Sequence, residues 1–387
     1  MGFDADVAVV GLGALGSHAA WRLAGRGQQV IGFEQFCLGH DRGSSHGLTR
    51  LFRVACLEHP NLVTMARRSR ALWHELQTQS VDPILEITGG IMIGPPKSAV
   101  VLGTLTAAQA HDLPVELLTR AQLTERFPQH QDLSDDTVGI WDPEAGIVYP
   151  ETAIRVAVAA AERAGATIYT DTKVVAIEPS ADRVVVKTAT SSVTARQVVV
   201  TTGAWLSALV PELELTPMRT PMTWFRPIDA HGDSFDLENF PVFVRVLDQG
   251  NGIWGHGAVN GCGVKVGPDH DPTVAAADPD CVDRSTSEND HALVSELLNR
   301  ALPGLDPEPS RIVICMVTHS RDGQFVVGRP HPNSRLVVGG GDSGHAFKHA
   351  PGLGELIAQI ITGEPTYVGT AFIDPQRLSH AARMKSR

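Results

Sequence analysis

The hydrophobic pattern at the start of the chain alternates between short apolar strands and a helical stretch. Residues 6–10 form an apolar, largely β-branched run, and the segment from Gly11 to Gly16 leads into a helical pattern that ends near 25–27. A second apolar run covers 29–34. Strand, glycine-rich turn, helix and strand within about thirty residues predict a complete βαβ unit.

The same patterning predicts further elements in α/β blocks that two excursions interrupt. Helices are predicted over about 60–79, 98–111, 151–164 and 351–362. Strands are predicted at 89–93, 166–170, 173–178, 183–188, 197–202, 312–317 and 336–338. The excursion 217–317 is mostly strand-like and is broken by a polar loop over 268–290. The polar stretch 38–55 is irregular, which inside an α/β core is typical of a functional loop.

The glycines of the first turn stand where a dinucleotide fingerprint has them. Gly11 permits the tight turn, Gly13 lets the backbone approach a pyrophosphate, and Gly16 allows the helix to pack closely on the strand. Together with Leu15 they form the expected phosphate grip, since a helix N-terminus presents oriented N–H groups to an anion. Glu34, at the end of the second strand, is placed to accept hydrogen bonds from ribose hydroxyls. The alternative is an ordinary glycine-rich turn.

This fingerprint alone does not distinguish NAD from FAD, because both carry the ADP half. An NAD enzyme usually has one continuous six-stranded domain. Here the pattern is interrupted early, and strand–glycine sequences recur at 202–205 and 339–341. Scattered returns to one sheet favour an extended FAD.

The length of the chain predicts two interleaved lobes. At 387 residues it exceeds one ordinary hydrophobic core, and Asp142 with Pro143 indicates a crossover between lobes. The predicted class is α/β (α+β), a Rossmann-like FAD-binding domain with a mostly antiparallel β substrate domain. The FAD-binding domain is assigned to 1–88, 146–216 and 318–387, and the substrate domain to 89–145 and 217–317.

Composition and charge exclude several classes of partner. Acidic residues number 43 against 32 basic ones, and neither sign forms a block, so nucleic acid and anionic lipid are not expected partners. No apolar run approaches the roughly 18 residues of a membrane helix. The acidic start is unlike a signal peptide, so we expect a cytoplasmic protein. Five cysteines without a Cys-x-x-Cys pair argue against disulfides and structural zinc, and no metal is expected.

Three basic residues are candidates for holding negative charge. Arg50 and Arg53 lie three positions apart in the polar loop. They are either surface arginines, or one sits over a flavin ring while the other clamps a substrate carboxylate. Lys265 is a lone base on an apolar strand. If its side chain is buried, it must be paired or functional, whereas at a sheet edge it would be merely a solvated or aggregation-blocking residue.

Two further segments carry candidate flavin chemistry. Residues 342–348 put polar groups between a strand and a helix N-terminus, whose dipole would stabilise negative charge on a reduced flavin, unless they form a simple capping loop. Cys315 lies in a predicted buried strand, where a cysteine is more often inert. The alternative is a covalent bond from its thiol to a flavin methyl group.

These segments together resemble the monomeric sarcosine oxidase and N-methyltryptophan oxidase family, within the glutathione-reductase/D-amino-acid-oxidase type of flavoprotein. The resemblance runs nearly end to end. It is carried by Gly11 to Gly16 with Glu34 and by segments 43–53, 202–205, 262–267, 315–316 and 343–348.

The resemblance implies a cofactor attachment and a set of roles. FAD would be linked through a thioether to Cys315, with Arg50 near the flavin ring. Arg53 and Lys348 would bind the substrate carboxylate, and Lys265 would be the cationic site where oxygen is reduced through a water. Cofactor contacts would also come from Ser45, His46, Thr49, Val174 (to adenine, through its backbone), Gly203, Trp205, Gly344, His345, Ala346 and Lys348. The protein would be a monomer.

The sequence departs from the family pattern where substrate choice is expected. Trp254 stands where the family has Tyr, and His270 meets the family His one place late. Val317 replaces an aromatic residue, and Leu48 replaces the acid of the Thr-Arg loop. Trp254 and His270 are therefore the candidates for substrate binding, and the identity of the substrate stays open.

The expected reaction is oxidation of the C–N bond of a secondary or N-substituted amino acid, with O₂ as the second substrate. A neutral amine gives up a hydride equivalent, so the protein must hold the donor carbon and supply positive charge. Lys265 and Arg50 are the catalytic candidates, since an ammonium stabilises the anion formed as O₂ becomes H₂O₂. The product would be an imine, which water hydrolyses.

Two alternatives remain. One is an oxidase or dehydrogenase of a cyclic imino acid, a glycated amino acid or a primary amino acid. The other is a flavin-bearing electron-transfer subunit that releases no peroxide. The carboxylate-binding candidates favour an enzyme, because an electron carrier needs no anion clamp.

Overall fold

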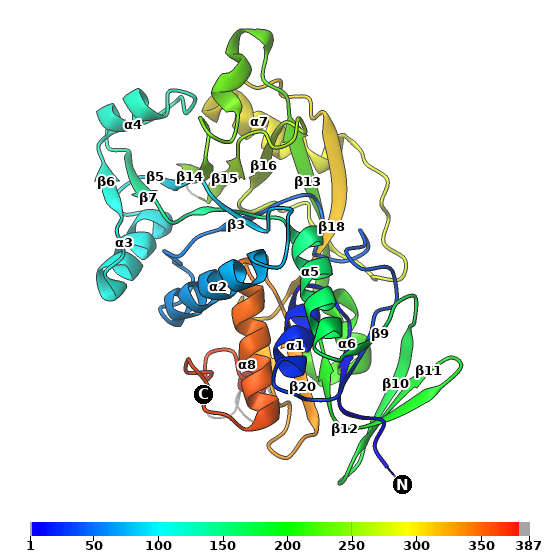
Figure 1. Cartoon of the computed structure of the whole chain (residues 1–387). Helices are drawn as coiled ribbons and strands as arrows, with labels where there is room; N and C mark the ends of the chain where they lie inside the picture. The colour runs from blue at the N-terminus through cyan, green and yellow to red at the C-terminus, as the bar shows by residue number, and fades with distance from the viewer. Residues whose placement is uncertain (1, 249, 379–387) are drawn as a thin grey trace, which may run out of the picture.

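The computed structural model describes residues 2–248 and 250–378, and Figure 1 shows a lower, helix-rich part and an upper, sheet-rich part. The lower part is built on a parallel sheet. Its parallel strands, in spatial order, are β20 (Leu336–Gly340), β12 (Ser192–Val200), β1 (Ala5–Val10), β2 (Val30–Phe33) and β9 (Thr167–Tyr169). Antiparallel additions are β10 (Val174–Pro179), β11 (Val184–Thr188) and β19 (Val326–Gly328).

Helices cover one face of this sheet, and the β10–β11 hairpin covers the other. Successive side chains of a strand point to opposite faces. Val7 and Val9 of β1 face a cluster formed with α1 (Ala14–Ala24), α2 (Asn61–Gln77), α5 (Pro150–Arg163) and α8 (Ala350–Thr362). Ala8 and Val10 face the cluster of the hairpin and the short helix α6 (Leu206–Leu209). The sheet is therefore buried on both sides, as a parallel sheet requires.

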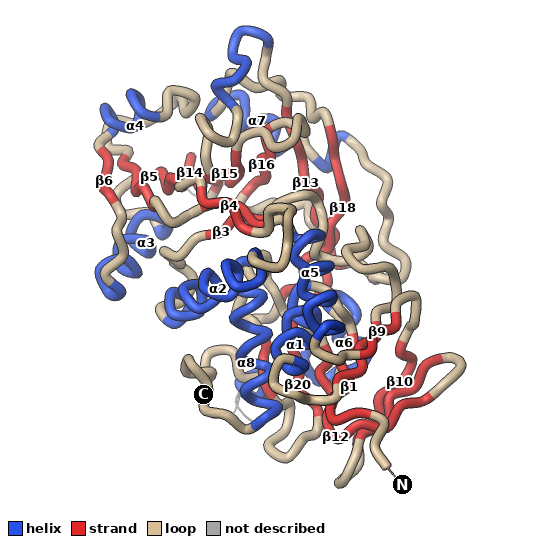
Figure 2. Tube along the Cα trace, viewed as in Figure 1, coloured by secondary structure: helices blue, strands red, loops and turns tan. Residues whose placement is uncertain are grey.

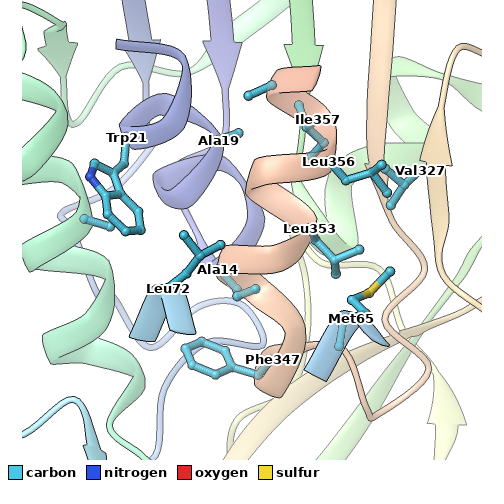
Figure 3. Close-up of a cluster of buried hydrophobic side chains, with 14 of the residues drawn as sticks. Ala14, Ala19, Trp21, Met65, Leu72, Val327, Phe347, Leu353, Leu356 and Ile357 are labelled. Carbon is cyan, nitrogen blue, oxygen red and sulfur yellow. The ribbon is translucent and has the colours of Figure 1, made fainter. Parts of the chain in front are cut away.

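The packing between α1, α2 and α8 is apolar at the centre and ionic at the edge. Figure 3 shows Leu353 and Leu356 of α8 beside Met65 of α2 and Ala19 of α1, all fully buried. Glu355 of α8 is only 3% exposed.

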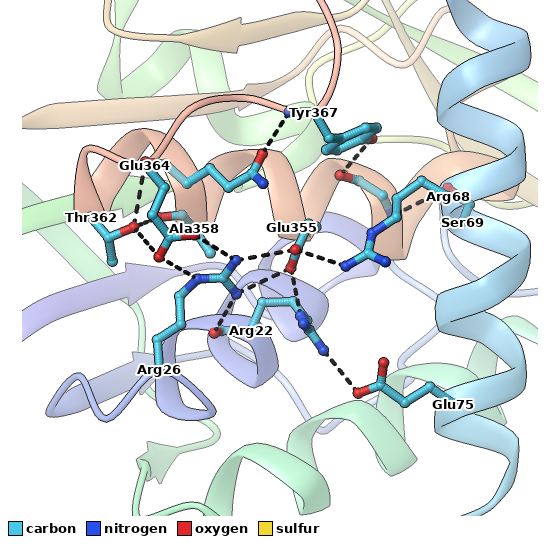
Figure 4. Close-up of polar contacts among 12 residues, drawn as sticks. Arg22, Arg26, Arg68, Ser69, Glu75, Glu355, Ala358, Thr362, Glu364 and Tyr367 are labelled. Atoms are coloured by element: carbon cyan, nitrogen blue, oxygen red, sulfur yellow. Dashed lines mark hydrogen bonds and ion pairs between the residues drawn. The ribbon is translucent and has the colours of Figure 1, made fainter.

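Three arginines surround the Glu355 carboxylate (Figure 4). Arg22 of α1 approaches it at 2.6 Å, Arg26 in the turn after α1 at 3.1 Å, and Arg68 of α2 at 2.9 Å. One acid thus ties three helices together.

The upper part is a nine-stranded sheet assembled from both excursions. Its order is β17 (Ala275–Ala276), β13 (Thr216–Phe225), β16 (Val264–Pro268), β15 (Asn251–His256), β14 (Val242–Asp248), β5 (Gly90–Gly94), β7 (Val138–Asp142) and β6 (Glu116–Leu118), with β18 (Arg311–His319) beside β13. All neighbours are antiparallel except β5 and β14, whose parallel pairing joins the two excursions. The helices here are α3 (Ala99–His111), α4 (Arg120–Arg126) and α7 (Ala292–Ala301).

A three-stranded sheet of β3 (Arg50–Phe52), β8 (Gly146–Val148) and β4 (Leu85–Ile87) lies between the two parts in Figure 2. After Asp142, where a crossover between lobes was predicted, the chain passes from β7 of the upper sheet to β8 of the middle one. The stretch 38–55 was predicted to be irregular, and this is only partly correct, because Arg50–Phe52 form β3 and pair with β8.

The predicted fold class is confirmed, and most predicted elements differ from the observed ones only at their ends. Three helices, α4, α6 and α7, were not predicted. The division into domains at the stated residues stays a prediction. Within the described residues, no helix is both long and apolar enough to cross a membrane.

Candidate dinucleotide and substrate site

A cavity of about 370 Å³, which we call the cofactor cavity, lies at the carboxyl ends of the parallel strands. Its lining includes Gly11 after β1, Glu34 after β2, Thr201 after β12 and Gly340 of β20. In open α/β sheets the ligand site lies at this edge.

The cavity brings together most of the cofactor residues assigned from sequence. Those that line it are Gly11, Gly13, Leu15, Glu34, Ser45, Arg50, Val174, Gly203, Trp205, Cys315, Gly344 and Ala346. Those that do not line it are Gly16, His46, Thr49, His345 and Lys348.

The three glycines of the first turn have separate geometric roles. Gly11 has a φ of +86°, and a Cβ there would lie 2.7 Å from the Thr201 oxygen. A Cβ on Gly16 would lie 1.8 Å from the Gly11 oxygen, so Gly16 permits packing rather than ligand contact. A Cβ on Gly13 would meet only the Ser45 hydroxyl, at 3.7 Å. Gly13 therefore leaves open space that a pyrophosphate fits.

The polar groups around this turn suit the ADP half of FAD. Helix α1 begins at Ala14 with no acidic residue in its first turn, so its N-terminal field is available to an anion. Glu34 is 5% exposed, and its oxygens accept from the N–H groups of Leu12 (2.9 Å) and Phe36 (3.2 Å). A carboxylate has further lone pairs for ribose hydroxyls. His40 lies 3.4 Å from the same carboxylate and was not predicted.

An acid from a distant loop reaches the cavity beside Val174 and Trp205. Asp280, which also lines the cavity, accepts a hydrogen bond of 2.8 Å from the Trp205 indole. Lys173 pairs with Asp280 at 3.4 Å. Asp280 belongs to the polar loop 268–290, and no local pattern in the sequence pairs it with Trp205.

Cys315 lies on β18 with its sulfur at the cavity wall. It is 3% exposed, and its Sγ is 3.7 Å from the Ser44 oxygen and 3.7 Å from an Arg50 guanidinium nitrogen. Burial raises the pKa of the Cys315 thiol, while the Arg50 charge opposes that effect. The prediction of a buried strand is confirmed.

Arg50 and Lys265 meet at one backbone carbonyl. Arg50 donates to the Thr49 oxygen at 2.8 Å and to the Ser44 oxygen at 2.5 Å. Lys265, 2% exposed, donates to the same Thr49 oxygen at 3.0 Å and to the Gly47 oxygen at 2.9 Å. Burial, followed by the Arg50 charge, lowers the pKa of Lys265 well below its usual value. Of the two alternatives stated for Lys265, a buried lysine and a solvated lysine at a sheet edge, the structure shows the buried one. Residues 47–49 lie between Lys265 and the cavity.

Arg53 and Lys348 converge on a carboxylate that was not predicted. The Glu58 Oε1 accepts from Arg53 at 3.0 Å and from Lys348 at 3.1 Å. Burial alone would raise the pKa of Glu58, but Lys348 and Arg53 outweigh it and hold the pKa well below the usual value. Among the described residues, Arg53 Nη1 and Glu58 Oε2 have no hydrogen-bond partner. Two cations and one acid leave one positive charge for a carboxylate ligand.

Burial lowers the pKa of three histidines near the cavity, His46, His256 and His345. Burial, then Arg50, lowers the pKa of His46 to about 3. Burial, then Lys348, lowers the pKa of His345 to about 4, and His345 lies 2.9 Å from the Gly323 oxygen. His256, which was not predicted, pairs with the Thr49 hydroxyl at 2.7 Å. Burial and Lys265 lower its pKa to about 3.

The two candidates for substrate choice lie away from the cavity. The Trp254 indole donates to the Pro268 oxygen at 3.0 Å, and its ring packs against an apolar cluster that includes Met92 and Val244. His270 is exposed at the surface. Strand β16 ends at Pro268, so His270 has already left the sheet that would direct it inward. The geometry does not support His270 as a substrate ligand.

The fold and the cavity define an FAD-dependent oxidoreductase, and residues 6–360 match the family described as FAD dependent oxidoreductase. The chain is 34% identical to monomeric sarcosine oxidase of Streptomyces avermitilis over 382 residues, 97% of this chain and 98% of that protein. It is 30% identical to N-methyl-L-tryptophan oxidase of Yersinia pestis over 363 residues, 94% of this chain and 96% of that protein.

A solved structure gives the same result for the fold. The amino acid oxidase NikD matches with a TM-score of 0.82 and 23% identity, covering 96% of this chain and 97% of that one. The chain belongs to the monomeric sarcosine oxidase and N-methyl-L-tryptophan oxidase family of FAD-dependent oxidoreductases. The resemblance stated from the sequence is therefore confirmed, and so is FAD as the family's cofactor.

Proposed function

We propose that this protein oxidises the C–N bond of a secondary or N-substituted amino acid and passes the electrons to O₂, releasing H₂O₂. The observation that carries the proposal is the buried pair of Arg53 and Lys348 on one carboxylate, close in sequence to cavity residues Arg50 and Ala346. Bound FAD supplies the acceptor for the hydride equivalent.

Arg53 and Lys348 hold the carboxylate of the substrate. Glu58 forms ion pairs with both cations. A substrate carboxylate either displaces Glu58 or uses the unpartnered Nη1 of Arg53. Charge-assisted hydrogen bonds of this kind fix an amino acid in one orientation, which brings the carbon beside its nitrogen to a defined position.

Arg50 and Lys265 supply positive charge without a strong base. The nearby His46, His256 and His345 are neutral at pH 7, because burial holds their pKa values between about 3 and 4. The His256 ring contacts the Thr49 hydroxyl and the Gly257 oxygen, and the His345 ring contacts the Gly323 oxygen. The Lys265 ammonium stabilises the anion that forms as O₂ is reduced.

Cys315 would hold FAD through a thioether to a flavin methyl group. The S–H bond and one methyl C–H bond would break, the flavin would take up the two electrons, and O₂ would reoxidise it. The Cys315 sulfur is at the cavity wall, and the guanidinium 3.7 Å away favours the thiolate that such a bond needs. We further infer a cytoplasmic monomer with the flavin domain in segments 1–88, 146–216 and 318–387. The concentration of parallel-sheet strands in these segments supports that division.

Two measurements test the proposal. Acid precipitation of the purified protein should leave the yellow colour in the pellet, and colour released to the supernatant would exclude the thioether. A peroxide-coupled screen should give its highest rates with N-methyl amino acids. Higher rates with cyclic, glycated or primary amino acids would reassign the substrate. Reduction of an artificial acceptor without any peroxide would exclude an oxidase.

A further inference from the structure

The backbone of residues 47–49 has a conformation that needs support. Gly47 has a φ of +93° and Leu48 a φ of +69°. Positive φ is uncommon for residues other than glycine, and two in succession make a sharply bent turn. A Cβ at Gly47 would lie 2.5 Å from the Met222 methyl group, so the turn is also tightly enclosed. Contacts from other elements must therefore hold it.

Glu151 and Lys265 hold this turn from two sides. One oxygen of Glu151, in the first turn of α5, accepts from the N–H groups of Gly47 (2.8 Å) and Leu48 (3.2 Å). The Lys265 ammonium donates to the carbonyls of Gly47 and Thr49. The Gly47 carbonyl and the Leu48 N–H belong to the same peptide group. This one peptide group therefore lies between the Glu151 carboxylate and the Lys265 ammonium. Its N–H faces the negative charge and its C=O faces the positive charge, so both charges favour the direction of its dipole.

Among the charged groups around Lys265, Glu151 is the carboxylate that can act as its counter-ion. Within residues 2–248 and 250–378, no ion pair joins Lys265 to a carboxylate. The titratable and charged groups that act on it are Arg50, Arg311, His46, His256, Cys315 and Glu151. Of these, only Cys315 and Glu151 raise its pKa. Burial keeps the Cys315 thiol neutral, and a thioether would remove its charge altogether.

We propose that Glu151 is the counter-ion and positioning residue of Lys265 and acts through the Gly47–Leu48 peptide group. The Lys265 ammonium lies 4.9 Å from the Trp224 ring, and this carboxylate opposes the effect of burial on its pKa. The same contacts fix the Thr49 carbonyl, which also receives Arg50. The role of Glu151 as counter-ion rests on these contacts alone, and only the use of Lys265 in oxygen reduction rests on the proposed function.

The direct test measures the protonation of Lys265 in the holoenzyme. Protein labelled with [ε-¹³C]lysine is titrated by NMR, and the Lys265 signal is identified by its absence in Lys265→Met. Glu151→Gln keeps an oxygen for the turn but removes the charge. Its Lys265 midpoint should fall by about one pH unit, the effect of a nearby charge. Glu162→Gln, the same change at an exposed site of α5, should leave the midpoint unchanged. An unchanged midpoint in Glu151→Gln overturns the inference.

A second variant and a rate measurement complete the test. If Glu151→Gln does not fold, Glu151→Asp keeps the charge but withdraws it from the turn. Its midpoint should also fall, and an unchanged midpoint again overturns the inference. In stopped-flow experiments, the loss of flavin reoxidation at high pH should move to lower pH with the midpoint, while flavin reduction keeps its rate. A midpoint that moves without a change in reoxidation would refute the role of Lys265 in oxygen reduction and leave Glu151 as its counter-ion.

Discussion

Replacing Glu355 with Gln should destabilise the protein because one buried carboxylate joins three helices. Arg22, Arg26 and Arg68 all approach it within 3.1 Å (Figure 4). Gln keeps the shape and one acceptor oxygen but leaves three buried or half-buried cations without their common anion. Breaking a buried pair in this way leaves uncompensated charge.

The pKa of Glu355 gives the magnitude. Burial alone would raise this pKa, but Arg26, Arg22 and Arg68 lower it from 4.5 to about 2. Since one pKa unit corresponds to about 1.4 kcal/mol, the ionised form contributes about 3 kcal/mol to the free energy of unfolding at pH 7. The pKa is depressed in the folded state, so this contribution is complete above pH 4.5 and is lost as the pH falls towards 2. At pH 3 less than half of it remains.

Urea unfolding followed by tryptophan fluorescence and circular dichroism measures this difference. We expect Glu355→Gln to lower the free energy of unfolding by about 3 kcal/mol at pH 7 and by less than half as much at pH 3. Glu75→Gln is the control, because Glu75 is 51% exposed and pairs only with Arg22, so it should cost less than about 1 kcal/mol. Equal stability of wild type and Glu355→Gln at pH 7, or a difference independent of pH, would refute the reasoning.

The other predictions concern the cofactor and the substrate. Gly16→Ala puts a methyl group 1.8 Å from the Gly11 oxygen and should lower both stability and FAD affinity, whereas Gly13→Ala meets little protein and should lower FAD affinity alone. Fluorescence titration of the apoprotein with FAD and thermal unfolding separate the two, and loss of stability in Gly13→Ala would contradict its assignment. Glu58→Gln frees Arg53 and Lys348 and should tighten binding of a carboxylate inhibitor by about tenfold or more, measured from the flavin spectrum; weaker binding would disprove competition by Glu58. Lys265→Met should slow flavin reoxidation by about a hundredfold and flavin reduction much less, and equal effects would remove its proposed role.

Local patterns were sufficient to predict the ADP side of the site. The residues from Gly11 to Glu34 form one βαβ unit, and their contacts, such as Leu12 to Glu34, lie within that unit. The glycine spacing and the acid at the end of the second strand predict these contacts, because the backbone geometry of a βαβ unit is fixed over a short stretch of sequence. The buried strand around Cys315 was equally visible in its run of apolar residues.

The reactive side depends on contacts between distant segments, which no local pattern reports. Glu58 meets Lys348 and Glu151 meets Gly47 only after the three sheets have assembled. His270 was assigned by residue type, but it lies beyond Pro268, the last residue of β16, and its side chain is exposed.

The two longer unpredicted helices each have a physical explanation, and α6, with four residues, is too short to show a period. Helix α7 has the helical spacing in Val294, Leu297, Leu298 and Ala301, but it lies in an excursion taken to be strands. Helix α4, over Arg120–Arg126, is too short to show a period.

The order of the parallel strands has a consequence for synthesis. Strand β20 completes the sheet beside β12, and residues 339–346 close the cavity that Gly11 begins. Domains usually fold as the nascent chain emerges, with N-terminal segments first. Here the first strand must wait for almost the entire polypeptide before its cofactor site exists. A chain that ends before β20 would lack part of the cavity wall, so yellow colour should report translation past residue 346 as well as correct folding.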